Sequence, residues 1–214
     1  ENGVFGAAVN LTTGRRPRAV VAADLDGDGD MDLAVVNSGD NTVGIYRNGG
    51  VANFLPAILF TVGTKPTGIT ALDVDGDGDV DLAVANEGSG DGSAGVISLL
   101  LNNGNAHFGT KRDLTTGVSP TAIVSADFNG DGWPDLATAN FGVDADTSTV
   151  GVLLNNRAGG FNNVTAFLTP PGPYRLAVGD VDRDGDLDIV TANLNANSLS
   201  LLVNDGTGSF GSDE

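Results

Sequence analysis

The sequence predicts an all-β fold, a β-propeller of four four-stranded blades, on three observations. A unit of about 50 residues recurs four times along the 214-residue chain. Within each unit, short apolar runs are bounded by Gly, Asn, Asp or Pro, and none holds a helical period. Each unit also carries the same acidic loop of nine residues. Four short strands in a repeat of this length are typical of propeller blades.

The acidic loop sets the register of the repeat. Its copies are 24–32, 73–81, 127–135 and 180–188, so the first aspartates lie 49, 54 and 53 residues apart. A proline stands seven residues before each loop, at Pro17, Pro66, Pro120 and Pro173. Two asparagines and a phenylalanine follow, as in Asn37, Asn48 and Phe54 of the first unit. All the length variation falls between the two asparagines.

Four apolar segments per unit give the expected strands. Segments such as 18–23 and 121–126 lead into the acidic loop, and segments such as 33–36 and 82–85 leave it. A third segment, such as 96–101 or 150–154, and a fourth, such as 54–62, complete the unit. The small residues of the first segment suit the crowded innermost strand, and the acidic loop joins the first strand to the second.

The repeat predicts one domain over 1–214, with blades at about 17–63, 66–117, 120–170 and 173–210. The last unit lacks a fourth strand, whereas an extra strand is expected at 5–13, where Phe5 lies twelve residues before Pro17. We expect strand 5–13 to complete the last blade, which would remove two exposed strand edges. A lone four-bladed ring and a ring-completing homodimer of eight blades both satisfy this pattern.

The acidic loops are predicted to bind metal. Each has oxygen-bearing side chains at positions 1, 3, 5 and 9 and a glycine at position 4, 6 or both. Carboxylates crowded into nine residues repel one another, and a hard cation such as Ca²⁺ relieves the repulsion. Acidic turns without metal are the alternative, but turns usually hold one or two aspartates rather than repeated sets. We expect about four Ca²⁺, one per blade, with a structural role.

The pattern P-x6-D-x-[DN]-G-D-G-x2-D-L-A-x-A-N, followed by V-x-L-L-N-N-G and a phenylalanine, resembles the FG-GAP/VCBS repeat of integrin-α-like β-propellers over essentially the whole chain. The resemblance implies that side chains at positions 1, 3, 5 and 9 and the main-chain carbonyl at position 7 bind calcium, on the face opposite the usual ligand face. The matching positions are Asp24, Asp26, Asp28, Asp30, Asp32, Asp73, Asp75, Asp77, Asp79, Asp81, Asp127, Asn129, Asp131, Trp133, Asp135, Asp180, Asp182, Asp184, Asp186 and Asp188.

Three features depart from that family pattern. Arg183 replaces glycine at position 4 of the last loop, and Trp133 and Pro134 follow the last glycine of the third loop. Family rings commonly have seven blades, where this chain encodes four.

The EF-hand shares the opening of the loop but requires an acidic residue at position 12, where this chain has Val35, Val84, Thr138 and Thr191.

Charge and composition narrow the function classes. The loops hold 18 of the 28 acidic residues, so the formal net charge of −18 is mostly local to them. The 10 lysines and arginines are scattered along the chain apart from one cluster, Arg15, Arg16 and Arg18. This distribution argues against nucleic-acid binding, which requires clustered cations. No apolar run is long enough for membrane insertion. Loops with millimolar calcium affinity would be filled outside cells, so we expect a secreted or cell-surface protein.

Residues for catalysis are scarce. The single histidine, His107, lies in a predicted turn, and the chain has no cysteine and no nucleophile-elbow motif. The remaining acidic candidates are Glu87, Asp91, Asp144 and Asp146 in the variable segments 87–95 and 141–149. Strand alternation places these segments on the face away from calcium, where binding specificity is expected. Aromatic candidates for sugar contacts are Phe141, Tyr46 and Tyr174, the last beside Arg175.

The main hypothesis is therefore a calcium-stabilised, extracellular binding or adhesion module that is not an enzyme and takes a glycan or a protein as ligand. One alternative is the scaffold or minimal catalytic part of a polysaccharide-degrading enzyme of the lyase kind. Another is a purely structural repeat of a larger surface protein.

Overall fold

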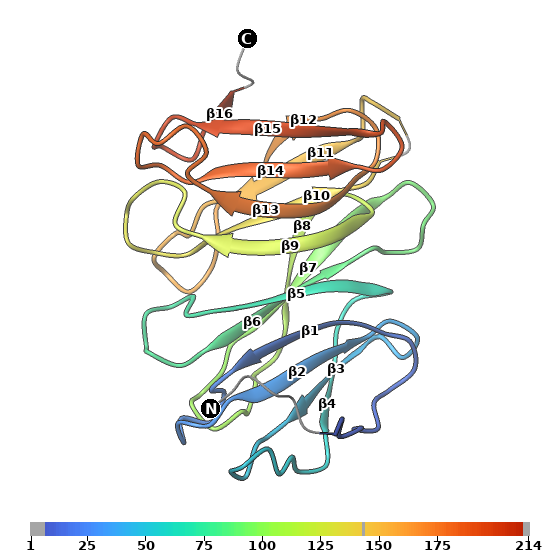
Figure 1. Cartoon of the computed structure of the whole chain (residues 1–214), viewed down its shortest axis with the longest axis vertical. Helices are drawn as coiled ribbons and strands as arrows, with labels where there is room; N and C mark the ends of the chain where they lie inside the picture. Colours follow the sequence, from blue (N-terminus) through green and yellow to red (C-terminus); the bar gives the residue numbers. More distant parts are fainter. Residues whose placement is uncertain (1–6, 143, 212–214) are drawn as a thin grey trace.

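The computed structural model describes residues 7–142 and 144–211, which form four antiparallel sheets (Figure 1). The strands are β1 (Pro17–Ala23), β2 (Asp32–Asn37), β3 (Thr42–Tyr46), β4 (Ile58–Thr61), β5 (Pro66–Leu72), β6 (Asp81–Asn86), β7 (Ala94–Leu100), β8 (Arg112–Val118), β9 (Pro120–Ala126), β10 (Asp135–Asn140), β11 (Thr149–Leu153), β12 (Thr165–Leu168), β13 (Pro173–Gly179), β14 (Asp188–Asn193), β15 (Ser198–Asn204) and β16 (Phe210–Gly211). The described residues include no helix that could span a membrane.

Each sheet is one blade with its strands in sequence order, β1-β2-β3-β4 in the first. Every acidic loop joins the first strand of its blade to the second, as the sequence predicts. The fourth strand differs from its predicted run 54–62, because Phe54 forms an isolated bridge with Asn48 and β4 begins only at Ile58. The pairing of the first two strands shifts register next to each proline, between Pro17 and Ala19 in β1.

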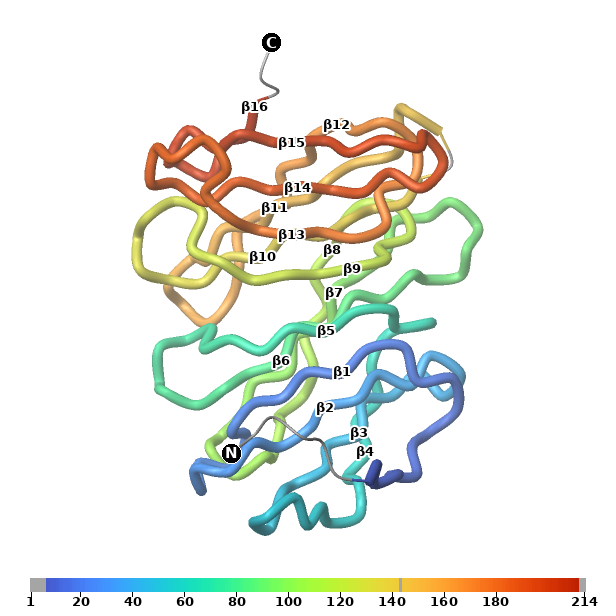
Figure 2. Tube along the Cα trace, in the orientation of Figure 1, coloured from blue at the N-terminus to red at the C-terminus, as the bar shows by residue number. Residues whose placement is uncertain are grey.

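The hydrophobic core lies between successive blades. One apolar cluster joins Ala34 and Ile45 of the first blade to Leu82 and Val84 of the second. First strands pack side by side, β1 with β5, β5 with β9 and β9 with β13, as Figure 2 shows. This spacing requires small residues, since a β-carbon on Gly68 would lie 3.2 Å from the main-chain nitrogen of Ile123. The small residues at this position of the first three blades, Ala19, Gly68 and Ala122, therefore follow from packing.

The N-terminal segment does not complete the last blade, which corrects the prediction for strand 5–13. Residues 7–13 form no strand, and the Tyr46 hydroxyl donates to the Thr12 carbonyl at 2.9 Å, so this segment lies on the first blade. The first and last blades stand at opposite ends of the longest axis (Figure 1), which keeps this segment away from β15. Phe5 of the predicted strand lies outside the described residues.

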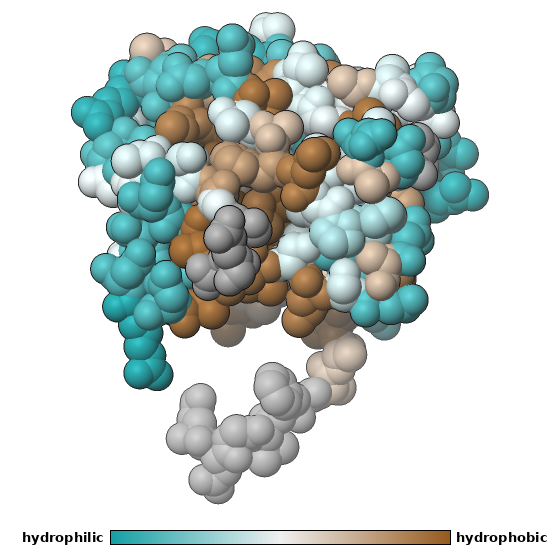
Figure 3. All heavy atoms as spheres, turned by 90° about the horizontal axis from the view of Figure 1, so that it is seen from above, coloured by the Kyte–Doolittle hydropathy of each residue, from teal (hydrophilic) through white to brown (hydrophobic). Residues whose placement is uncertain are grey.

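The last blade keeps an open edge and an open face. Within the described chain, β15 pairs with β16 only at Val203 and Asn204. Figure 3 looks down on this blade and shows apolar residues gathered on its outer face, with polar residues around them. Leu199 is 73% exposed there, whereas its counterpart in the first blade, Val43, is fully buried. Closure of the four blades into a ring is thus not observed.

Candidate metal centres and a candidate ligand pocket

The first aspartate of each acidic loop holds the loop in shape. Asp24 accepts the N–H of Gly27 at 2.8 Å on one carboxylate oxygen and that of Gly29 at 3.0 Å on the other. The counterparts Asp73, Asp127 and Asp180 likewise accept two main-chain N–H groups of their own loops. The carboxylate at position 1 therefore fixes the conformation of the loop through its main chain.

The ninth residue anchors the loop from inside the blade. These four aspartates are at most 1% exposed: Asp32, Asp81, Asp135 and Asp188. Asp81 accepts the N–H of Val74 at 2.9 Å and that of Asn102 at 2.7 Å. Burial raises the pKa of Asp81 to about 6, although these two hydrogen bonds act in the opposite direction. A buried carboxylate of this kind is stable in its ionised form only when hydrogen bonds or a cation compensate for its lost hydration.

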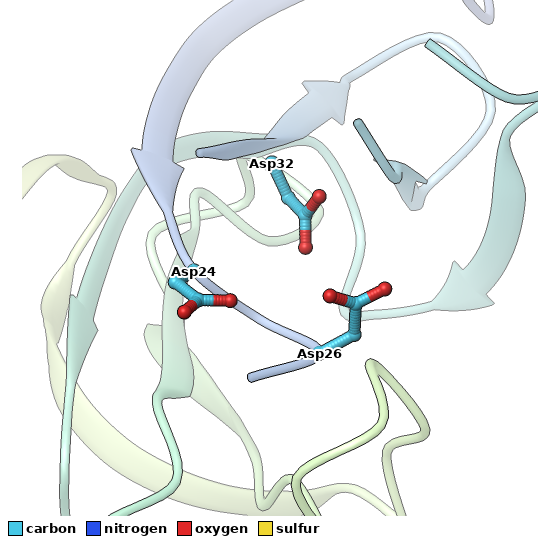
Figure 4. A group of neighbouring side chains, drawn as sticks. All are labelled: Asp24, Asp26 and Asp32. Atoms are coloured by element: carbon cyan, nitrogen blue, oxygen red, sulfur yellow. The ribbon is translucent and has the colours of Figure 1, made fainter. Parts of the chain in front are cut away.

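Positions 1, 3 and 9 meet in three of the loops. Carboxylate oxygens of Asp24, Asp26 and Asp32 lie within 4.8 Å of one another and point toward a common centre (Figure 4). The same holds for the triads Asp73, Asp75, Asp81 and Asp180, Asp182, Asp188. In the described chain, one buried oxygen of Asp26 and one of Asp75 have no hydrogen-bond partner. Such oxygens suit a hard cation, which would supply the missing partner.

The third loop differs in charge. Asn129 stands at position 3, so this loop brings one carboxylate fewer to its centre. Arg157 forms an ion pair with Asp131 at 2.8 Å. Burial raises the pKa of Asp131, but hydrogen bonds from Arg157 and the main chain outweigh this effect, and the pKa lies below its usual value. The third loop thus pairs one carboxylate closely with an arginine, whereas the ion pair of the first loop, Arg47 with Asp26, is longer at 3.8 Å.

Positions 5 and 7 lie outside the carboxylate triads. The position-5 residues Asp28, Asp77, Asp131 and Asp184 each accept the N–H of position 7 at 2.9 Å. The Asp79 side chain lies against Gly104, and the Trp133 ring against Gly76 of the neighbouring loop. Coordination by positions 5 and 7, including Asp30 and Asp186, stays a prediction.

Position 4 requires a left-handed backbone in all four loops. Gly27, Gly76 and Gly130 have φ of 74°, 76° and 67°, and Arg183 has φ of 69°. The last loop thus keeps the shape of the others although its residue has a β-carbon, which makes this conformation unfavourable.

Asparagines link the first three acidic loops to the next blade, a role that the sequence analysis missed. The side-chain amides of Asn102, Asn155 and Asn204 donate to main-chain carbonyls of the preceding loop, at Leu25, Val74 and Phe128 respectively. We call these three residues the inter-blade asparagines. The same side chains also bond to their own loops, for example Asn102 to Val80. The regular spacing of these asparagines was visible in the sequence, but the carbonyls they reach were not.

The side chains at position 2 pack the first three loops against the next blade, which brings each loop within hydrogen-bonding distance of an inter-blade asparagine. Leu25, Val74 and Phe128 are at most 1% exposed and fill the core between blades. Val181, their counterpart in the last blade, is 51% exposed. Loop shape and blade packing are therefore coupled wherever another blade follows.

A pocket of about 250 Å³ lies at the opposite ends of the first strands. Its lining is Arg18, Thr67, Glu87, Ser119, Thr121, Phe141, Tyr174 and Arg175. The variable segments contribute Glu87 and Phe141, in agreement with their expected place away from the acidic loops. Phe141 and Tyr174 meet edge to face with ring centroids 6.3 Å apart, and the Arg175 guanidinium carbon lies 4.4 Å from the Tyr174 centroid.

The other candidates from the sequence lie elsewhere. Tyr46 is buried on the first blade and acts in packing. His107 is exposed and directly follows a bend at residues 104–106. Asp144 caps its own turn by accepting the N–H of Thr147 at 3.0 Å, and Asp91 does the same for Ser93 at 3.0 Å. Asp146 is exposed in the same variable segment as Asp144.

Fold and loops together define a repeat protein made of propeller-type blades, each with one acidic loop, three of which bring carboxylates close enough to hold a metal ion. The family model for the FG-GAP-like repeat matches residues 1–35, 24–84, 73–138 and 141–191. The chain belongs to the FG-GAP-like repeat family.

No match was found among curated proteins. Among solved structures, the chain is similar to a mutant of the Tc holotoxin pore of Photorhabdus luminescens, with a TM-score of 0.46 and 17% identity. That match covers 96% of this chain and 9% of the holotoxin chain.

Proposed function

We propose that this chain is a calcium-stabilised, extracellular β-propeller module that binds a glycan or a protein ligand without catalysing a reaction. The observation that carries the calcium part is the carboxylate triad with an unpartnered buried oxygen, found at Asp26 and again at Asp75. Calcium takes six to eight oxygen ligands, and these loops offer carboxylates and main-chain carbonyls in close succession.

The metal acts on structure in this proposal. The first three loops are each tied to the next blade through an inter-blade asparagine, so an ion that fixes one of these loops also fixes the interface. Binding free energy then becomes folding free energy. Loops of this kind bind calcium with weak affinity, which the millimolar calcium outside cells satisfies.

The ligand-binding part rests on the pocket at the other end of the blades. Side chains from the first strands of all four blades and from two variable loops converge there, including Thr67, Thr121 and Phe141. Loops on a rigid β scaffold are where binding residues usually gather. The pocket lies away from the acidic loops, so ligand and calcium would not compete for the same groups.

Ligand screening with a turnover assay tests this function. Binding on a glycan array or to a partner protein, with no change in the ligand, would support a binding module. Release of unsaturated oligosaccharides from a polysaccharide would instead favour the part of a lyase-like enzyme. Neither activity, with calcium-dependent stability alone, would favour a purely structural repeat.

A further inference from the structure

The ligand pocket contains the residues at which the blades depart from their own repeat. The residue after each proline is Arg18, Thr67, Thr121 or Tyr174, and all four line this pocket. Thr67 and Thr121 have a structural task, since their hydroxyls donate to main-chain carbonyls of neighbouring strands, such as that of Pro120 at 2.8 Å. Arg18 and Tyr174 replace threonine in the first and last blades; among the described residues, the last blade has no following first strand that could offer such a carbonyl.

Arg175 departs further from the repeat. Its counterparts are Ala19, Gly68 and Ala122, which are small because an adjacent first strand packs on them. The Arg175 side chain instead lies over the Tyr174 ring and donates from one terminal nitrogen to the carbonyls of Thr121 at 3.2 Å and Tyr174 at 2.9 Å. These contacts hold the guanidinium at the pocket and leave its other terminal nitrogen and Nε for a ligand.

The pocket is cationic although the chain is strongly acidic. Among the described residues, neither Arg18 nor Arg175 forms an ion pair, whereas five other basic side chains do. Glu87 is the acidic group in the pocket, and it pairs with Lys65 at 3.4 Å. A second pocket shares Arg18, Thr67 and Glu87 with the first and adds Arg16, Ser38 and Lys65. The joined groove therefore has four cations and one carboxylate.

We propose that this groove binds a saccharide that carries a carboxylate, with Arg175 and Arg18 on the carboxylate and Phe141 and Tyr174 against the sugar ring. The proposal rests on the binding function proposed above and names its ligand class. A guanidinium fork matches a carboxylate with two parallel hydrogen bonds. The threonine hydroxyls donate to carbonyls, so their lone pairs remain free to accept from sugar hydroxyls.

Calorimetric titration at saturating calcium tests the proposal with three probes: an oligoglucuronate, the same oligosaccharide with its carboxylates reduced to alcohols, and a glutamate peptide of equal charge. We expect the oligoglucuronate to bind, and the other two to bind at least about tenfold more weakly, because each lacks either the carboxylates or the ring. Added salt should weaken the binding, since it screens the charges.

Two variants form a matched pair. Arg175→Ala and Arg183→Gly each remove one positive charge and each restore the residue type found in the other blades, so both should fold. We expect Arg175→Ala to weaken oligoglucuronate binding about tenfold or more, with the melting temperature preserved, and Arg183→Gly to leave binding unchanged. Equal loss in the two variants would mean a general charge effect and would overturn the proposed site.

Other outcomes separate this inference from the module itself. Equal binding of the reduced oligosaccharide or of the peptide would overturn the carboxylate-bearing saccharide as ligand. No binding of the oligoglucuronate at all would do the same. In each case calcium-dependent melting and binding of a different glycan or protein would still support the proposed module, whereas loss of calcium dependence would count against the module.

Discussion

The side-chain amide of Asn102 donates to the main-chain carbonyl of Leu25 at 2.8 Å, across 77 positions of the chain. Leu25 is the second residue of the first acidic loop, and Asn102 lies two residues after the third strand, β7, of the next blade. The main-chain N–H of Asn102 also donates to Asp81, the anchoring carboxylate of its own loop, at 2.7 Å. One side chain thus connects two candidate metal loops, which makes blade packing sensitive to loop shape.

Asn102→Ala should destabilise the protein by about 2 kcal/mol, because the buried carbonyls of Leu25 and Val80 lose their donor. Asn48→Ala is the matched control. Among the described residues no blade precedes that of Asn48, and its amide donates to Met31 at 3.3 Å in its own loop, so a smaller loss is expected. Urea unfolding at saturating calcium measures both. Equal losses would show that the contact between blades adds nothing.

The third loop should be the weakest calcium site. It has Asn129 in place of an aspartate, and Arg157 already pairs with Asp131. Asn129→Asp should raise the affinity of this site about tenfold, because calcium affinity in such loops follows the number of charged ligands. Calcium titration calorimetry would show the change, with the exposed Asn10→Asp as control for added charge. An unchanged weakest site in Asn129→Asp would refute this ranking.

Arg183→Gly should stabilise the protein by roughly 1 kcal/mol. Arg183 has φ of 69°, a region that glycine enters without the clash between β-carbon and carbonyl. Arg183→Ala serves as the control, since it removes the same charge but keeps the β-carbon. Thermal unfolding should rank glycine clearly above alanine. If the alanine variant were equally stabilised, charge rather than backbone strain would be responsible.

The calcium-free protein should lose stability as the pH rises. Asp81 has its pKa raised from 3.8 to about 6 by burial, so the folded state binds this proton more tightly than the unfolded chain. The stabilisation is complete below pH 3.8 and is lost as the pH rises through about 6. Urea unfolding in EDTA across this range measures it. Calcium should reverse the trend, because ions bind the ionised carboxylates.

Asp81→Asn provides the check on that assignment. Asparagine has nearly the same shape but cannot titrate, so the calcium-free variant should show a flatter stability profile between pH 4 and pH 6. A profile as steep as that of the unchanged protein would assign the pH dependence to other groups.

Local sequence patterns predicted the blades, the strand order and the acidic loops, because each depends on residues close in sequence. The resemblance to the FG-GAP/VCBS repeat implied that Asp24, Asp26 and Asp32 converge with Asp28 on one ion, and the first three do converge. Contacts between blades could not be predicted from these patterns. The carbonyl that Asn102 finds, and the meeting of Arg18 with Tyr174 in one pocket, depend on how blades stack.

Ring closure shows the limit of the repeat pattern. The complementary strand edges predicted that residues 5–13 would join the last blade. Whether they can do so depends on where the first and last blades lie relative to each other, which the repeat pattern does not specify. Residues 7–13 lie on the first blade instead, next to Tyr46.

Thermal unfolding with and without calcium tests the central claim most directly. The account predicts that exhaustive chelation lowers the melting temperature steeply and that added calcium restores it, since each site filled at a hundredfold excess over its dissociation constant contributes about 2.7 kcal/mol. Elemental analysis of the chelated sample shows whether metal is gone. An unchanged melting curve in metal-free protein, with calcium still without effect on re-addition, would contradict the claim.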